Sequence, residues 1–94
     1  MASAFLDGVP TFEADGRTLN MLIETPRGSR GKFKFDEATG LYQLHKLLPF
    51  GFFFPFHFGF IPHTRGEDGD PLDILLLLDM DIPQGSLVHA RRPS

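Results

Sequence analysis

The order of apolar and polar residues predicts short strands joined by tight turns. Residues 20–24 (NMLIE) form a mostly apolar run that predicts a buried strand. Residues 32–36 (KFKFD) alternate between polar and apolar, which is typical of a half-buried strand. The turn signal at residues 37–40 (EATG) then leads into a return strand over residues 41–48, so we expect these two strands to form a hairpin.

Phenylalanine occupies every second position from Phe50 to Phe60, in the segment FGFFFPFHFGF. On an extended chain these rings all fall on one face. Pro55 argues against a helix and against a central position in a sheet. We expect this phenylalanine face to belong to the core. The alternative is an exposed apolar surface that binds a partner.

Two further strands complete the pattern. The apolar run over residues 72–78 (LDILLLL) predicts a strand that is buried on both faces. Residues 85–90 (GSLVHA) predict one more strand, and the sequence contains no convincing amphipathic helix. We therefore expect a mainly β protein, either a small β-barrel of five or six short strands or the β-rich half of something larger. The domain would cover residues 19–94, and residues 1–18 would form a loosely attached N-terminal arm.

Length, charge and composition narrow the classes of function. A chain of 94 residues holds one modest core, and its net charge of −3 argues against nucleic acid as a partner. The absence of cysteine excludes disulfides and cysteine metal sites. The N-terminus has no signal-peptide pattern, and no apolar run is long enough to span a bilayer. We expect a cytoplasmic protein with no membrane partner.

Three aspartates, Asp68, Asp70 and Asp73, lie directly against the last apolar run. Carboxylates this close repel one another, so burial would force them to take up protons or a cation. Their oxygens suit Mg²⁺, Ca²⁺ or Mn²⁺. A calcium EF-hand is excluded because the sixth loop position, which needs glycine, would be Asp73. The alternative is a hydrated acidic turn whose side chains cap local amides.

A basic hairpin is the second candidate for chemistry. Lys32 and Lys34 lie on its first strand, next to PRGSRG, and Lys46 lies on the return strand. Cationic side chains and glycine amides are the groups that a phosphate needs. The segment is not a Walker A loop, because Phe33 follows Gly31-Lys32. A solvated hairpin rim is the alternative, but in combination with the aspartates the hairpin favours phosphoryl transfer to water.

Three segments together resemble a known family. IETPRGSRGKFKFDEATG, FPFHFGFIPHT and EDGDPLDILLLL occur in the order, and near the spacing, of the soluble family I inorganic pyrophosphatases, from about Asn20 to the C-terminus. The resemblance implies an OB-fold-like β-barrel, Mg²⁺ as cofactor, and hydrolysis of diphosphate to two phosphates by a metal-activated water. It also implies that the chain corresponds to the N-terminal half of the family, without the C-terminal helical part.

The resemblance assigns roles to individual residues. Asp68 and Asp73 correspond to metal ligands, and Asp70 to the carboxylate that helps to activate the water. The substrate-binding positions are Lys32, Lys46 and Phe58. The positions at the edge of the site are Glu24, Lys34 and Phe54.

Four of these positions depart from the family pattern. Lys34 stands where the family usually has glutamate, and Lys46 stands where it usually has arginine, so that a bidentate fork becomes a point charge. Phe54 and Phe58 stand in place of two tyrosines, which removes two hydroxyl donors.

The resemblance therefore predicts an inorganic diphosphatase, a hydrolase acting on phosphoric anhydrides, whose substrate is the small molecule diphosphate. Because the family continues for about the same length beyond Ser94, we expect this chain to be weakly active or inactive alone. The alternative is a non-catalytic module of the same family that binds phosphate or a partner. We also expect a homo-oligomer, because exposed strand edges and apolar faces favour association.

Overall fold

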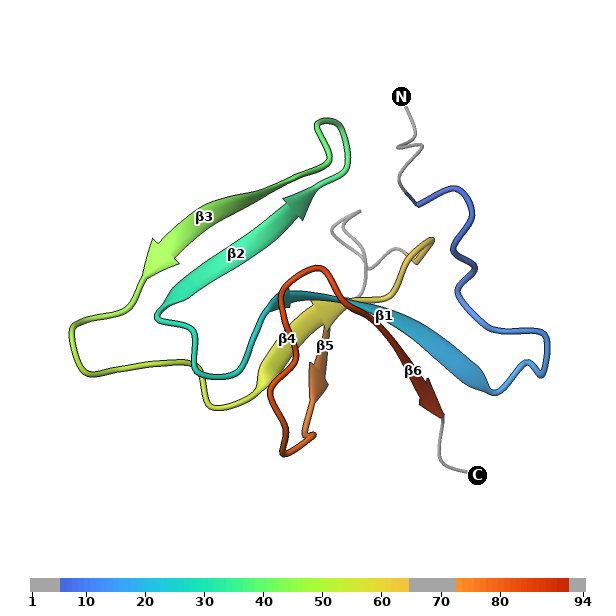
Figure 1. Cartoon of the computed structure of the whole chain (residues 1–94). Helices are drawn as coiled ribbons and strands as arrows, with labels where there is room; N and C mark the ends of the chain where they lie inside the picture. Colours follow the sequence, from blue (N-terminus) through green and yellow to red (C-terminus); the bar gives the residue numbers. More distant parts are fainter. Residues whose placement is uncertain (1–5, 65–72, 92–94) are drawn as a thin grey trace.

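The structure is a computed structural model that describes residues 6–64 and 73–91. These residues form six strands and no helix, so the expectation of a mainly β protein is confirmed (Figure 1). The strands are β1 (Thr18–Thr25), β2 (Gly31–Asp36), β3 (Leu41–Leu47), β4 (His57–Phe60), β5 (Asp73–Leu76) and β6 (Leu87–Arg91). Within the described ranges, no helix has the length and hydropathy needed to cross a membrane.

Four of the strands form an antiparallel sheet in the order β5-β4-β1-β6, and β2 and β3 form a separate hairpin beside it (Figure 1). The described strands thus form two sheets that do not close into a barrel, while the mainly β expectation holds. Side chains, rather than a backbone ladder, join β1 to β2. The Thr25 hydroxyl donates to Phe33 O at 3.0 Å and accepts from Phe33 N–H at 2.9 Å. Glu24 Oε2 accepts from Phe35 N–H at 2.7 Å, so backbone groups that could extend a sheet are already occupied.

The core lies between the four-stranded sheet and the hairpin. β1 is central, with β4 and β6 as neighbours, and its residues from Asn20 to Thr25 are all buried. Leu22 and Phe60 form one buried cluster with Leu6. The hairpin covers this cluster with Phe35 and Tyr42, and the Phe35 ring stacks on Phe60 with centroids 6.2 Å apart. Burial of these apolar side chains is what holds the hairpin against the sheet.

The phenylalanine segment does not form one buried face. Phe60 is 3% exposed, but Phe50 is 89% exposed and Phe52 and Phe56 are also exposed. The reason is a turn in which Phe52 N–H donates to Pro49 O at 3.0 Å, with Gly51 at φ 92°. Extended alternation begins only at β4, so the prediction of a single core face is wrong.

The strand predicted over residues 72–78 is shorter than expected and is not buried on both faces. β5 covers only Asp73–Leu76, and Leu72 lies outside the described residues. Its burial alternates, Leu75 is exposed, and Leu77 beyond the strand is 69% exposed. β5 pairs only with β4 and lies at the end of the sheet order, so one side of it has no neighbour among the described strands.

Residues 6–12 are attached to the sheet, which corrects the expectation of a loose arm over that part. Leu6 is buried in the core cluster. The Thr11 hydroxyl donates to Pro62 O, and Asn20 Nδ2 donates to Pro10 O, each at 2.8 Å. The division of the chain at residues 18 and 19 stays a prediction.

His57 links two loops from the interior. Its side chain is fully buried, its Nδ1 accepts from Arg27 N–H at 3.0 Å, and its Nε2–H donates to Met80 O at 2.8 Å. Close by, the Arg27 guanidinium pairs with Asp79 and Asp81. The loop after β1 and the loop after β5 are thus held together by one ring and one guanidinium.

We predict that His57→Phe lowers the free energy of unfolding by about 1–3 kcal/mol, because it leaves the Arg27 N–H and the Met80 carbonyl without their partner. Denaturant unfolding measures this loss. His45→Phe is the matched control, since His45 is exposed on β3 and should change stability little. Equal losses in the two variants would contradict the structural role of the His57 hydrogen bonds.

Candidate active site

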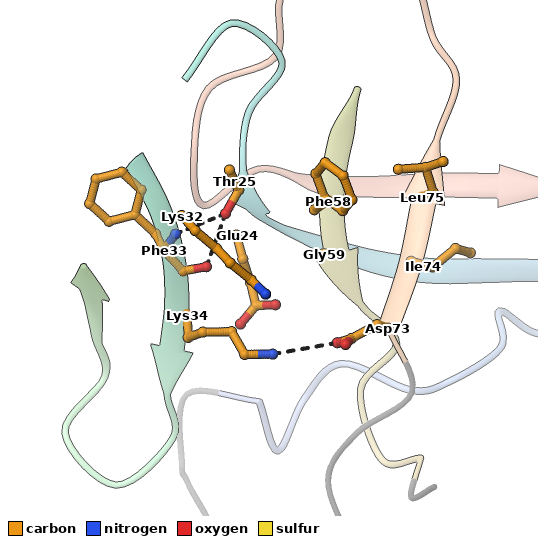
Figure 2. A pocket seen from close by; sticks show the side chains of 10 residues that line it. All are labelled: Glu24, Thr25, Lys32, Phe33, Lys34, Phe58, Gly59, Asp73, Ile74 and Leu75. Atoms are coloured by element: carbon orange, nitrogen blue, oxygen red, sulfur yellow. Dashed lines mark hydrogen bonds and ion pairs between the residues drawn. The ribbon is translucent and has the colours of Figure 1, made fainter. Parts of the chain in front are cut away.

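A cleft of about 370 Å³ lies between the hairpin and the sheet. Four strands line it, and Figure 2 shows its side chains from β1, β2, β4 and β5. The lining residues are Glu24, Thr25, Lys32, Phe33, Lys34, Phe58, Gly59, Asp73, Ile74 and Leu75. The cleft therefore combines two acids, two lysines and an apolar wall.

Strand periodicity explains why the two lysines share this cleft. Lys32 and Lys34 are two residues apart on β2, so their side chains leave the strand on the same face. Gly59 allows β4 to approach β1 closely, since an added Cβ there would lie 2.0 Å from Leu22 O. Ile74 is the register partner of Gly59, which places the start of β5 on the opposite wall from the lysines.

Glu24 is a buried carboxylate at the inner end of the cleft. It is 6% exposed, and its Oε2 accepts from Phe35 N–H. Burial raises the pKa of Glu24 above its ordinary value of 4.5, and the hydrogen bond from Phe35 and the nearby charge of Lys34 oppose that rise. The negative charge of Asp73 raises the pKa further. Glu24 is thus an acid whose charged form depends on its cationic neighbours.

An ion pair crosses the cleft. Lys34 Nζ on β2 lies 3.7 Å from Asp73 Oδ1 on β5 (Figure 2). The side chains are 37% and 71% exposed, so the pair faces solvent and contributes at most about 1 kcal/mol to stability. A second hollow of about 360 Å³, towards Asp36 and His45, shares Glu24, Lys34 and Asp73 with the first. The ion pair therefore lies where the two hollows meet.

The comparisons with known proteins identify the family. The family model for inorganic pyrophosphatase matches residues 21–92. The chain is 40% identical over 88 residues to the inorganic pyrophosphatase of Thermus thermophilus, covering 94% of this chain and 50% of that protein. It is 42% identical over 72 residues to the soluble inorganic pyrophosphatase of Oryza sativa subsp. indica, covering 77% of this chain and 34% of that protein. The chain belongs to the inorganic pyrophosphatase family.

Solved structures agree with this assignment. The crystal structure of the Thermus thermophilus inorganic pyrophosphatase superimposes with a TM-score of 0.81 at 40% identity, over 94% of this chain and 51% of that chain. The inorganic pyrophosphatase of Ehrlichia chaffeensis also gives 0.81, at 32% identity, over 90% of this chain and 55% of that chain. The chain thus spans about half the length of the solved pyrophosphatases that it matches.

The structure brings five of the predicted site residues into the cleft. They are Glu24, Lys32, Lys34, Phe58 and Asp73. Phe54 is not among the residues that line the cleft, and its ring packs edge-on against Phe58, with centroids 5.3 Å apart. Asp68 and Asp70 lie outside the described residues. The roles that the family pattern gives to these residues stay predictions.

Lys46 is placed by the hairpin register. It lies opposite Lys32 in the β2–β3 ladder, next to a register shift between Lys32 and Phe33. It is not among the residues that line either hollow in the described part of the chain. Like charges in opposed positions repel, and an anion bound between the two lysines would reduce that repulsion.

Sequence reasoning missed Thr25 and Gly59. Thr25 uses its hydroxyl to tie β2 to β1 and so fixes one end of the cleft. Gly59 could have been suspected, because a glycine between two phenylalanines in a strand indicates a close backbone approach. Nothing in the local sequence marks Thr25, since its partner Phe33 comes after an intervening turn.

The donor chemistry of the cleft fits Mg²⁺ in type. Glu24 and Asp73 supply carboxylate oxygens, which are the hard ligands that Mg²⁺ prefers. Within residues 6–64 and 73–91, no group of three or more His, Cys, Asp or Glu side chains is close enough to hold a metal ion. The described cleft therefore offers two carboxylates of the type that Mg²⁺ prefers, fewer than the three ligand side chains of a metal cluster.

We predict that Glu24→Gln stabilises the fold at neutral pH. Glutamine keeps an oxygen for Phe35 N–H and removes a charge that burial disfavours. Because the folded pKa is raised, the folded state holds its proton to higher pH than the unfolded state, so stability falls as pH rises from 4.5 through the folded pKa. The variant should unfold like the parent near pH 4 and exceed it increasingly towards pH 7.

Thermal unfolding measured from pH 4 to pH 8 tests this prediction. Glu37→Gln, in the turn after β2, is the charge-matched control and should leave the profile unchanged. A Glu24→Gln variant that is less stable than the parent at pH 7 would show that the carboxylate charge stabilises the fold.

Proposed function

We propose that the cleft between the hairpin and the sheet is one wall of the active site of a Mg²⁺-dependent inorganic pyrophosphatase, which hydrolyses diphosphate to two phosphates. The observation that carries the proposal is the meeting of Lys32, Lys34 and Asp73 beside buried Glu24 in a chain of this family. Cations for phosphate and carboxylates for metal are the two parts that phosphoryl transfer to water requires.

The lysines supply the anion-binding part. Lys32 and Lys46 are opposed on the hairpin, so a phosphate group between or above them would neutralise two like charges at once. A lysine ammonium binds phosphate as a point charge without a fixed fork. Diphosphate, with several negative charges, is the substrate that fits this arrangement.

The carboxylates supply the metal-binding part. We assign Asp73 and Asp68 to hold Mg²⁺, with Glu24 at the edge of the site. Bound Mg²⁺ would neutralise phosphate charge and make a bound water more acidic. Asp70 is assigned to take the proton of the attacking water, whose oxygen forms a bond to one phosphorus while the bridging P–O bond breaks and the second phosphate leaves.

Because the chain spans about half the length of its relatives, we propose that 94 residues alone hydrolyse diphosphate weakly or not at all. A site with one wall leaves diphosphate charges in contact with water, where electrostatic stabilisation is weak. The same proposal places the protein in the cytoplasm and in a homo-oligomer. Its support for association is the exposed Leu75 and Leu77 at the β5 end of the sheet.

The Lys34–Asp73 ion pair favours a second candidate, a phosphate-binding module without catalysis. In that case the ammonium would keep its place at Asp73, and the cleft would bind phosphate through its lysines without turnover. The two candidates differ in whether Mg²⁺-dependent phosphate release can be obtained once the rest of the site is supplied.

The first prediction of the proposal concerns turnover. Phosphate release with Mg²⁺ should be at background for the chain alone and should rise when the chain is fused to the C-terminal half of the Thermus thermophilus relative. Asp70→Asn should abolish the gain and Asp73→Asn should reduce it strongly, whereas Arg17→Gln, just before the first residue of β1, should not change it. Turnover by the chain alone that Asp70→Asn removes would overturn the one-wall proposal, and binding without turnover in the fusion would favour the module.

The second prediction concerns Phe58. Tyrosine has nearly the same volume as phenylalanine and adds a hydroxyl donor to the cleft, so Phe58→Tyr should tighten diphosphate binding about tenfold without loss of stability. Titration calorimetry of the fusion measures the change. Phe52→Tyr adds the same hydroxyl at an exposed ring outside the cleft lining and should have no effect. If Phe58→Tyr leaves the affinity for diphosphate unchanged, the prediction is wrong and the edge of this ring does not face the bound phosphate.

A further inference from the structure

Lys34 and Lys32 leave β2 on the same face but have different partners. Lys34 Nζ lies 3.7 Å from Asp73 Oδ1. Among the described residues, no ion pair is formed by Lys32. One lysine of the cleft is therefore engaged with a carboxylate, and the other is free to meet an anion.

We propose that Lys34 is a resident cation of the cleft, which competes with divalent metal ions for Asp73 and so sets the metal affinity of the site. The proposal rests on the proposed function only in taking Asp73 as a metal ligand. An ammonium at this position uses the carboxylate oxygen that a metal needs. It also repels a doubly charged ion that approaches the same side chain.

The backbone on both sides of Lys34 is fixed, which keeps its side chain directed across the cleft. Phe33, before it, is held by the Thr25 hydroxyl through both N–H and C=O. Phe35, after it, donates its N–H to Glu24. Both anchoring side chains come from buried positions at the end of β1, so the β2 backbone beside Lys34 is attached to the central strand of the sheet.

The field of Lys34 reaches beyond Asp73. Its positive charge lowers the pKa of Glu24, against the effect of burial, and Asp73 acts on Glu24 in the opposite direction. One ammonium thus faces both acids of the cleft. A metal ion entering here would meet two carboxylates whose charge is already partly balanced.

Direct metal binding tests the proposal without diphosphate and without turnover. Titration calorimetry with Mn²⁺ should show weak binding to the parent chain and about tenfold tighter binding to Lys34→Gln and to Lys34→Met, which keeps an aliphatic stem in the cleft. Lys34→Arg keeps the charge and should stay weak. The gain should disappear in the double variant Lys34→Gln, Asp73→Asn.

Two charge-matched controls separate competition at Asp73 from a general change of charge. Lys32→Gln removes one positive charge from the same cleft without touching the ion pair, and we expect it to tighten Mn²⁺ binding no more than about twofold. Arg17→Gln removes one charge just before the first residue of β1, whereas the cleft lies at the last residues of that strand, and it should have no effect. An equal gain in Lys32→Gln and Lys34→Gln would overturn the proposal.

The proposal is also overturned if Lys34→Gln and Lys34→Met fold like the parent but bind Mn²⁺ no more tightly. A measurement on the unaltered chain covers the case in which these variants do not fold. Mg²⁺ titration followed by the NMR signal of the Lys34 Nζ group should shift that signal as the ammonium leaves Asp73. Saturation with Mg²⁺ and an unchanged Lys34 signal would contradict competition. Neither readout depends on hydrolysis, so a failure of this proposal can be distinguished from a failure of the proposed enzymatic function.

Discussion

The hydrogen bond between Phe35 N–H and the buried Glu24 carboxylate joins the two parts of this molecule where the cleft begins. No backbone ladder links the hairpin to the sheet in the described residues, so a few side chains determine their relative position. The contact made by Glu24 carries a free-energy penalty, because burial disfavours the charged form of its carboxylate. A neutral residue would hold the hairpin with a smaller free-energy penalty, but it would leave Asp73 as the one acid among the described residues that line the cleft. This is the trade between stability and function that active sites commonly show.

One ion pair crosses the cleft. Lys34 pairs with Asp73, while Lys32 lies on the same hairpin with Lys46 opposite it, outside the residues that line the cleft. Separate regions for anion and cation recognition follow from this arrangement, with the anion region on the hairpin and the cation region towards β5. Under the proposed function, diphosphate would bind at the hairpin region and a metal ion at the region towards β5, and the junction of hairpin and sheet brings the two regions side by side.

Local pattern was sufficient to predict much of this architecture from the sequence. Alternation in KFKFD predicted β2 and placed Lys32 and Lys34 on one face, because strand periodicity depends only on neighbouring residues. The phenylalanine segment failed because the turn at Gly51 interrupts the extended chain. The burial of the leucine run depends on which strands pair in space, and among the described strands β5 pairs only with β4. The contact between Lys34 and Asp73 joins strands far apart in the chain, which no local pattern encodes.

The side-chain junction between β1 and β2 gives the hairpin an opening motion of its own. Three hydrogen bonds can break while the β2–β3 ladder stays intact: the Thr25 hydroxyl donates one and accepts one, and Glu24 accepts the third. Local opening of this kind costs less free energy than global unfolding. The amides of Phe33 and Phe35 would then exchange with solvent deuterium in step with each other, at a rate set by the junction and not by the stability of the hairpin. Their exchange rate is therefore a measure of how often the cleft opens.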